Sequence, residues 1–191
     1  MTTFEILSTD WGAFGYVATD GRLQATWLPQ PKPEMLALIR REWPDAVEAR
    51  GVLPTLGDAV SAYFAGDPVE FNVPLDLEKF TPFQQSVLKA CARLRYGQTA
   101  SYADLARSAG RPLAARAVGN TMARNTCPLV IPCHRVLRCG GGLGGFSGPD
   151  GTALKQRMLD WEAEHSGAAL VKAARGARTV RAAERVLAGV A

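Results

Sequence analysis

The feature that most constrains this chain is a short apolar run between two prolines, followed at once by a cysteine and a histidine. Residues 128–136 read Pro-Leu-Val-Ile-Pro-Cys-His-Arg-Val. Two of the three apolar residues are β-branched, which predicts a brief buried strand. Pro132 cannot donate to a strand ladder and fixes its own φ, so a turn should begin there. Cys133 and His134 are therefore expected where the backbone leaves a buried element.

Cys133 is the candidate nucleophile. A thiol beside a histidine and an arginine, at the possible start of a helical turn, is predicted to have a lowered pKa. The alternative is an ordinary buried cysteine, the commonest fate of a free thiol. The bracketing prolines and the Cys-His-Arg order favour the reactive thiol.

The overall composition is that of a folded soluble protein. The chain has 191 residues, of which 47% are hydrophobic and 21% charged, enough for one large domain or two small ones. No apolar run approaches membrane-spanning length and residues 1–5 lack a signal pattern, so a cytoplasmic protein with no membrane partner is expected. Four cysteines are too few for a disulfide framework.

Charge divides the chain into an acidic and a basic part. Residues 1–80 carry 6 Lys and Arg against 12 Asp and Glu, whereas residues 81–147 carry 9 against the single Asp104. A basic surface alone can exist without a partner. Because this basic segment also holds the Cys-His turn, the pattern favours a polyanionic partner, namely nucleic acid.

Residues 1–78 are predicted to form an acidic α/β supporting domain, with a small antiparallel sheet and helices. Asp20-Gly21 is a strong hairpin signal. No Cys or His occurs in residues 1–80, so no recognisable chemistry or usual zinc site is expected there. The predicted strands cover residues 4–7, 15–18 and 23–28, the predicted helices cover residues 34–43 and 55–65, and residues 69–77 form an edge strand or a linker.

Residues 79–166 are predicted to form a mostly α domain of the winged helix-turn-helix kind. Capping boxes at Thr81–Gln84 and Ser101–Asp104 open two helices, and Pro112 is predicted to begin a third that runs to residue 123. The third helix is mostly Ala and Gly, with Arg116 as its one long basic side chain. That composition suits the minor groove of DNA better than base reading in the major groove, although small residues also serve plain helix packing.

The remaining segments are a glycine-rich loop over residues 139–148, a final firm helix and a basic, Ala-rich tail over residues 167–191. The loop frees its backbone N–H groups to approach a ligand. Glu162 lies on the final helix near its buried edge, and its position alone gives little reason to assign it a function. The tail is expected to fray, with a basic helix against DNA phosphates as the alternative.

These features together resemble the O6-alkylguanine-DNA alkyltransferase family, also called methylated-DNA–protein-cysteine methyltransferases. The resemblance is close over residues 80–165 and loose before them. It implies DNA repair by direct damage reversal, in which one irreversible transfer moves a methyl or alkyl group from O6-alkylguanine to Cys133, with O4-alkylthymine as a second candidate substrate. It also implies a monomer that binds double-stranded DNA through the minor groove, with no cofactor and no metal.

The resemblance further implies catalytic roles for the matching residues. Cys133 accepts the alkyl group, His134 acts on the thiol as a base through a water, and Glu162 orients His134. Asn125 braces the active-site turn. Tyr102 rotates the DNA phosphate and donates to the guanine ring, so it serves both in catalysis and in DNA binding.

On the DNA and substrate side, the resemblance assigns Arg116 to the gap left by the flipped base, with Ala115 and Arg135 as further DNA contacts. Val136 is implied to offer its carbonyl to the guanine amino group, and Ser147 its backbone N–H to O6. Two departures from the family concern pocket size.

The first departure is Phe146, a pocket residue that stands where many members have tyrosine. The second is the stretch over residues 148–151, which looks about two residues longer than the compact form of the family. Neither departure touches the predicted Cys133, His134 and Glu162 relay, but both bear on substrate range.

Three alternatives remain open on the sequence alone. A hydrolytic Cys/His enzyme is disfavoured because His165 is the only other histidine. A non-catalytic, damage-sensing DNA binder of the alkyltransferase-like type would not need Cys133. A metal cluster of Cys127, Cys133 and Cys139 is weak, because a six-residue spacing is too wide for the usual ligand pairs.

Overall fold

A four-stranded sheet forms the centre of the N-terminal half in this computed structural model, which describes residues 1–166. The strands are β1 (Thr2–Thr9), β2 (Gly12–Thr19), β3 (Arg22–Gln30) and β4 (Val47–Glu48). The first three form the expected antiparallel meander, and Asp20 and Gly21 turn between β2 and β3 with positive φ, as a two-residue hairpin requires. The short β4 pairs in parallel with β1, so the sheet is mixed.

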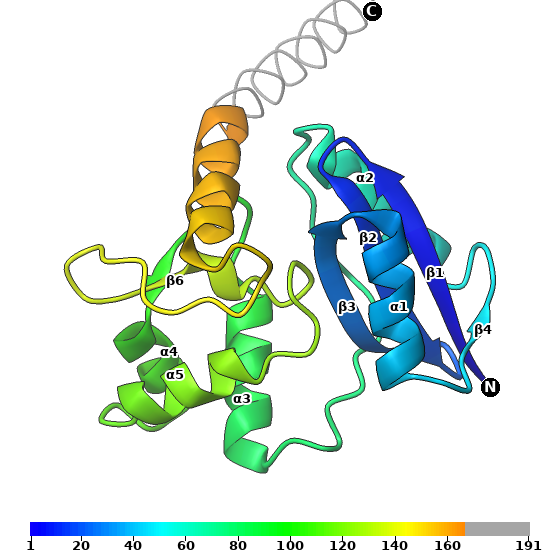
Figure 1. The fold of residues 1–191 in the computed structure, drawn as a ribbon. Coiled ribbons are helices and arrows are strands. Elements are labelled where there is room, and N and C mark those ends of the chain that lie inside the picture. The colour runs from blue at the N-terminus through cyan, green and yellow to red at the C-terminus, as the bar shows by residue number, and fades with distance from the viewer. Residues whose placement is uncertain (167–191) are drawn as a thin grey trace, which may run out of the picture.

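The two helices of this half, α1 (Lys32–Glu42) and α2 (Pro54–Phe64), cover opposite faces of the sheet (Figure 1). Met35 of α1 packs in one cluster with Val17, whereas Val60 of α2 packs in another with Tyr16. Neighbouring residues of β2 therefore serve different faces, as the pleat of a strand dictates. A Cβ at Gly15 would lie 2.5 Å from Met35 Sδ, so glycine at this position lets α1 approach the sheet.

The C-terminal half is mostly helical. Its elements are α3 (Pro82–Ala92), α4 (Tyr102–Ser108), α5 (Ala115–Ala123), a helix over residues 152–166, and the parallel pair β5 (Ala100–Ser101) and β6 (Val136–Leu137). Both predicted capping boxes are present, at Thr81–Gln84 and Ser101–Asp104, where each side chain binds the backbone of the other residue.

Two local predictions are wrong. The helix predicted from Pro112 begins later, at Ala115, because residues 112–113 form a turn. The buried strand predicted at residues 129–131 is also a turn, in which Leu129 has a φ of 75° and Ile131 N donates to Cys127 O at 2.8 Å. The apolar side chains are buried as expected, but no strand within residues 1–166 pairs with their backbone.

The two halves share one hydrophobic core and are joined by hydrogen bonds at the turn that precedes Cys133, residues 126–132. Thr26 of β3 donates its N–H to Thr126 O at 2.9 Å and its hydroxyl to Pro128 O at 2.6 Å. On the other side of the core, Trp161 Nε1 donates to Tyr63 O at 3.1 Å. The N-terminal half therefore holds the turn that precedes Cys133 and the helix that carries Glu162.

The linker between the halves follows α2 in an extended path, with one isolated parallel bridge between Leu23 and Leu75. The predicted boundary after residue 78 falls in this segment. The predicted tail over residues 167–191 lies outside the described residues. Within residues 1–166, no helix is both long and apolar enough to cross a membrane.

Candidate active site

Two tight turns place the side chains of Cys133 and His134 in different surroundings. Pro132 has φ −78° and ψ 65°, and Cys133 N donates to Ile131 O at 2.7 Å, which is an inverse γ-turn. A single 3₁₀ turn (Cys133–Arg135) follows. Because such a turn has about three residues, successive side chains point roughly 120° apart. Cys133 faces a cavity, and His134 points into the core.

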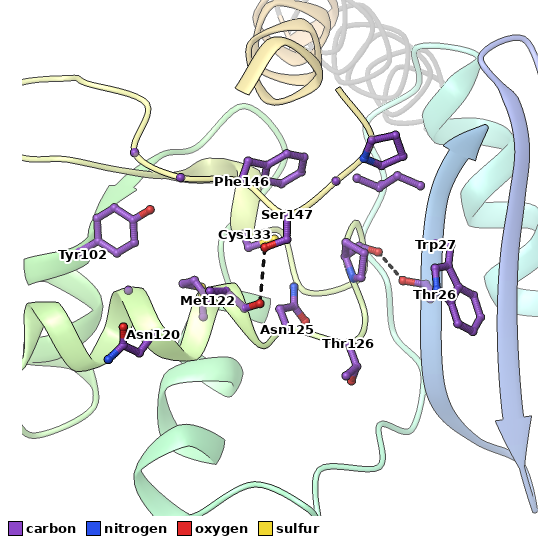
Figure 2. A pocket seen from close by; sticks show the side chains of 18 of the residues that line it. Thr26, Trp27, Tyr102, Asn120, Met122, Asn125, Thr126, Cys133, Phe146 and Ser147 are labelled. Atoms are coloured by element: carbon purple, nitrogen blue, oxygen red, sulfur yellow. Dashed lines mark hydrogen bonds between the residues drawn. The ribbon is translucent and has the colours of Figure 1, made fainter. Parts of the chain in front are cut away.

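The cavity at Cys133 has a volume of about 1130 Å³ and lies between the two halves (Figure 2). Its walls come from β3, α1, the first residues of α4, one face of α5, the turn over residues 125–133 and the glycine-rich loop. Of the predicted site residues, it brings together Cys133, Asn125, Tyr102, Ala115, Arg116, Phe146 and Ser147.

Glu162 is the centre of a buried polar cluster behind Cys133. Its side chain is 1% exposed. Glu162 Oε1 lies 2.8 Å from His134 Nε2, and Arg135 donates to both carboxylate oxygens from Nε and Nη2 at 2.8–3.1 Å. Tyr63 OH donates to Oε1 and Gly97 N donates to Oε2, each at 3.0 Å. Four segments of the chain thus meet at one carboxylate.

The charge state of this cluster follows from its contacts. Burial alone would raise the pKa of Glu162, but the hydrogen bonds and charges of His134 and Arg135 lower that pKa to about 2. Burial lowers the pKa of His134, and the opposing pull of Glu162 is the weaker effect. At neutral pH the cluster therefore holds an ionised glutamate, a charged arginine and a neutral histidine.

A neutral His134 can act as a base. The carboxylate of Glu162 only accepts hydrogen bonds, so His134 Nε2 carries the ring proton. His134 Nδ1 is then an acceptor, and it is buried with no hydrogen-bond partner among the described residues. The ring is held in one orientation by Glu162, and its basic nitrogen, Nδ1, makes no hydrogen bond within residues 1–166.

The thiol of Cys133 does not behave as the sequence predicted. Burial raises its pKa, although Asn125 and Lys155 pull it the other way. The predicted lowering is wrong because Arg135 is turned away onto Glu162 and His134 is neutral, so neither neighbour offers a positive charge to the sulfur. The resting site holds a thiol, and a base has to remove its proton during reaction.

Asn125 holds the ends of the active-site turn together. Its Nδ2 donates to Ile131 O at 2.8 Å and its Oδ1 accepts from Cys127 N at 3.0 Å. Both polar atoms of the amide are therefore used on backbone groups inside the turn. This bracing also supports Leu129 in its left-handed conformation, which is sterically costly for a branched side chain.

Tyr102 stands on the opposite side of the cavity, at the start of α4 (Figure 2). It is half-buried, and burial raises the pKa of its hydroxyl, which therefore remains a hydrogen-bond donor. A Cβ at Gly144 would lie 2.6 Å from Tyr102 OH, so the glycine-rich loop approaches the ring where only glycine fits. Phe146 is half-buried against the core, and the exposed Ser147 donates its hydroxyl to Ala123 O at 3.4 Å.

Arg116 and Ala115 begin α5 at the rim of the cavity. Arg116 is exposed, and it makes no hydrogen bond or ion pair with the rest of residues 1–166. Its guanidinium is therefore available to a partner outside the chain.

Comparison with known proteins agrees with this geometry. A family model described as the DNA-binding domain of 6-O-methylguanine DNA methyltransferase matches residues 82–164. The constitutive methylated-DNA–protein-cysteine methyltransferase of Bacillus subtilis is 41% identical over 135 residues, which cover 66% of this chain and 81% of that protein. The chain belongs to the methylated-DNA–protein-cysteine methyltransferase family. The methyltransferase of Mycobacterium tuberculosis H37Rv is 43% identical over 113 residues, which cover 59% of this chain and 67% of that protein.

Solved methyltransferase structures share the whole fold. The O6-methylguanine methyltransferase of M. tuberculosis has a TM-score of 0.70 at 33% identity and covers 86% of this chain and 94% of its own. The M. tuberculosis OGT in complex with DNA has a TM-score of 0.71 at 31% identity, covering 85% and 94%. The predicted family, enzyme class and two-part fold class are confirmed.

Two residues of this methyltransferase do not lie where their predicted roles need them. Arg135 is 3% exposed, with its guanidinium bound to Glu162 and to Leu94 O at 2.6 Å, so the prediction that it contacts DNA is wrong. Val136 is fully buried and does not line the cavity. Its carbonyl accepts from Lys155 Nζ at 2.6 Å, which contradicts its prediction as a substrate-pocket residue.

Sequence reasoning missed three contributors to the methyltransferase site. Tyr63 of α2 binds Glu162, and Trp27 of β3 lines the cavity, so the N-terminal half does contribute to the site despite the prediction that it carries no chemistry. Lys155 is fully buried, which lowers its pKa, and it holds the backbone just after the 3₁₀ turn. The sequence offers one sign of the role of Lys155, namely that this lysine falls on the apolar stripe of the last helix.

The metal-cluster alternative finds no support. Within residues 1–166, no group of three His, Cys, Asp or Glu side chains is arranged to hold a metal ion. Cys127 is buried and Cys139 is exposed, whereas Cys133 lies between these extremes at the cavity.

Replacing Glu162 with Gln should lower the free energy of unfolding by about 3–5 kcal/mol, because Arg135 would remain buried without its counter-charge. The loss should be full at neutral pH. It should shrink as the pH falls from about 4.3, the ordinary pKa of glutamate, towards the folded pKa of about 2, because wild-type Glu162 then becomes protonated too. Urea unfolding over this pH range measures the difference.

Glu164→Gln is the matched control, since Glu164 is exposed on the same helix. Its stability should stay within about 0.5 kcal/mol of wild type. Equal stabilities for the two variants at neutral pH would contradict the central role of the buried carboxylate.

Proposed function

We propose that this protein repairs O6-alkylguanine in duplex DNA by moving the alkyl group to Cys133 in one irreversible step. The observation that carries the proposal is the arrangement of Glu162 and His134 behind a thiol that opens into a cavity large enough for a purine. Residues 79–166 carry the acceptor and the DNA-binding surface, and residues 1–78 support them. The protein acts as a monomer.

The transfer is an in-line displacement. His134 takes the thiol proton at Nδ1 through a water, as the sulfur attacks the alkyl carbon. The S–C bond forms while the C–O bond breaks, and the electron pair of that bond stays on guanine O6. Glu162 steadies the imidazolium that forms, as the third member of a nucleophilic relay does. The product thioether has no route back to a thiol, so each molecule acts once.

The leaving oxygen needs donors as it gains charge. Tyr102 OH and the backbone N–H of Ser147 stand on the cavity wall for this purpose. The same donors would serve O4-alkylthymine, which presents a similar alkylated oxygen. Asn125 keeps the acceptor turn in place by filling its backbone hydrogen bonds.

The target atom lies inside the duplex, so the base must leave the stack, at a cost of a few kcal/mol. In this proposal Arg116 fills the gap and Ala115 contacts the minor groove, which is supported by their position at the start of α5 on the rim of the cavity. The loop before α5 adds exposed positive charge at Arg111, which attracts phosphates.

Incubation with duplex DNA that contains O6-methylguanine should add one methyl group to the intact protein, measured by mass spectrometry and mapped to Cys133. A Cys133→Ser protein should gain none. A Cys139→Ser protein, which lacks the exposed cysteine instead, should gain the methyl group as wild type does. Tight binding to the damaged duplex without any gain of mass would overturn the proposal in favour of a damage sensor.

Arg116→Ala should slow methyl transfer from duplex DNA at least about tenfold more than it slows reaction with the free alkylated base, because only the duplex requires base flipping. Single-turnover rates on the two substrates give the ratio. Arg124→Ala removes an equally exposed charge at the other end of α5 and should slow both reactions by a similar factor. An equal loss on both substrates for Arg116→Ala would contradict its base-flipping role.

A further inference from the structure

One large apolar side chain of the C-terminal half stands in solvent. Leu113 is fully exposed, and the other exposed large apolar side chains within residues 1–166, Met1 and Val47, belong to the N-terminal half. A single exposed leucine is common on protein surfaces and needs no explanation by itself. Leu113 is different because of the backbone that carries it and the residues beside it.

The backbone at Leu113 is fixed by hydrogen bonds. Helix α4 ends in a Schellman motif, in which Gly110 has a φ of 73° and the N–H groups of Gly110 and Arg111 donate to the last turn of the helix. Ala114 N then donates to Arg111 O at 2.9 Å, which closes a β-turn. Pro112 and Leu113 occupy its two central positions. The leucine is therefore held at the tip of a braced turn.

Leu113 also lies close to the point where the proposed mechanism inserts Arg116 into DNA. Consecutive Cα atoms are about 3.8 Å apart, so the Cα atoms of these two residues are separated by at most about 11 Å. A DNA strand advances by about 3.4 Å per nucleotide. DNA that receives Arg116 therefore passes within about three base pairs of Leu113.

The charges around Leu113 suit a polyanion. Arg111 and Arg116 are both exposed, and neither side chain makes a hydrogen bond or ion pair with the rest of residues 1–166. Asp104, the single acid of the basic segment, is already held in an ion pair. A DNA backbone can therefore approach the turn without meeting an unpaired carboxylate of this segment.

An apolar side chain has a use at an opened base pair that a charged one lacks. Proteins that bind the minor groove insert apolar side chains, leucine among them, between base steps. When a base leaves the stack, the faces of its neighbours are exposed to water, and an apolar side chain can cover them. Leu113 leaves water only when DNA is bound, so its burial stabilises the bound state alone.

We infer that Leu113 is an apolar wedge that enters the minor groove beside Arg116 and stabilises the opened duplex around the flipped guanine. Arg116 fills the gap itself, Leu113 packs against the sugars and base edges next to the gap, and Arg111 binds a neighbouring phosphate. Leu113 acts on the duplex and not on the transfer step. The inference rests on the proposed function and adds a residue to its DNA contact.

Equilibrium binding to a duplex that contains O6-methylguanine tests the contact, in Cys133→Ser protein so that no transfer occurs. Leu113→Ala in this background should weaken binding about fivefold, because apolar contact is lost. The slope of log affinity against log salt should not change, because no phosphate contact is lost. Arg111→Ala should weaken binding and reduce the slope by about one. An equal reduction of the slope by Leu113→Ala would contradict an apolar contact.

Single-turnover methyl transfer, with the duplex below saturation, separates this role from the chemistry. Leu113→Ala should slow transfer from the duplex about fivefold and leave the reaction with the free alkylated base unchanged. Leu113→Met keeps the apolar volume and should retain the wild-type duplex rate, whereas Leu113→Asn should not. Because Leu113 is fully exposed, all three variants should keep the wild-type urea midpoint.

Val47→Ala is the matched control, since it shortens an exposed apolar side chain on β4 and should change neither reaction. If Leu113→Ala repairs the duplex at the wild-type rate, or slows both reactions equally, the wedge is refuted while the proposed function stands. The same holds if Leu113→Asn performs as well as Leu113→Met. If wild type transfers no methyl group from the duplex, the proposed function itself fails.

Discussion

The buried carboxylate of Glu162 is the interaction on which the rest of this structure depends. It collects hydrogen bonds from α2, from the backbone at Gly97 and from two successive residues of the 3₁₀ turn. A buried charge is tolerated only when such partners surround it. By meeting this need, the fold fixes the last helix against both halves and holds the His134 ring in one orientation. The same contact therefore serves stability and chemistry.

The chemistry follows from how the charges are distributed. The guanidinium of Arg135 is bound to Glu162. Although Arg135 is close to Cys133 in sequence, its positive charge therefore does not face the sulfur. Burial leaves His134 neutral and Cys133 protonated. Under the proposed mechanism, the nucleophile stays protonated until a substrate carbon is in place and His134 removes the proton. If each molecule acts once, as proposed, this restraint is useful, because any stray alkylation would consume the molecule.

Much of this could be predicted from the sequence, where the signals are local. The capping boxes at Thr81 and Ser101 and the Asp20-Gly21 hairpin depend on neighbours within a few residues, and all three are confirmed. The contacts that define the site are distant in sequence. Tyr63 lies 99 residues from Glu162, and Thr26 lies 102 residues from Pro128. No local pattern marks either of them.

The wrong predictions have the same cause, because they concern residues whose contacts are distant in sequence. In the sequence, Arg135 looks like a surface arginine in a basic segment. Only the tertiary fold shows that its guanidinium binds the buried carboxylate of Glu162. The run over residues 129–131 has strand-like composition, but its backbone closes on itself in a turn, with Ile131 N donating to Cys127 O. The N-terminal half carries no Cys or His, yet its sheet supplies an apolar wall of the cavity.

The central claim is that His134, oriented by Glu162, releases the Cys133 proton within the site. The most direct test is the pH dependence of the single-turnover methyl-transfer rate. Internal proton transfer predicts a nearly constant rate from about pH 6.5 to 8.5, between the lowered pKa of His134 and the raised pKa of Cys133. His134→Gln should convert that plateau into a steady rise with pH. A wild-type rate that itself rises about tenfold per pH unit across this range would mean that solvent, not His134, takes the proton, and would contradict the account.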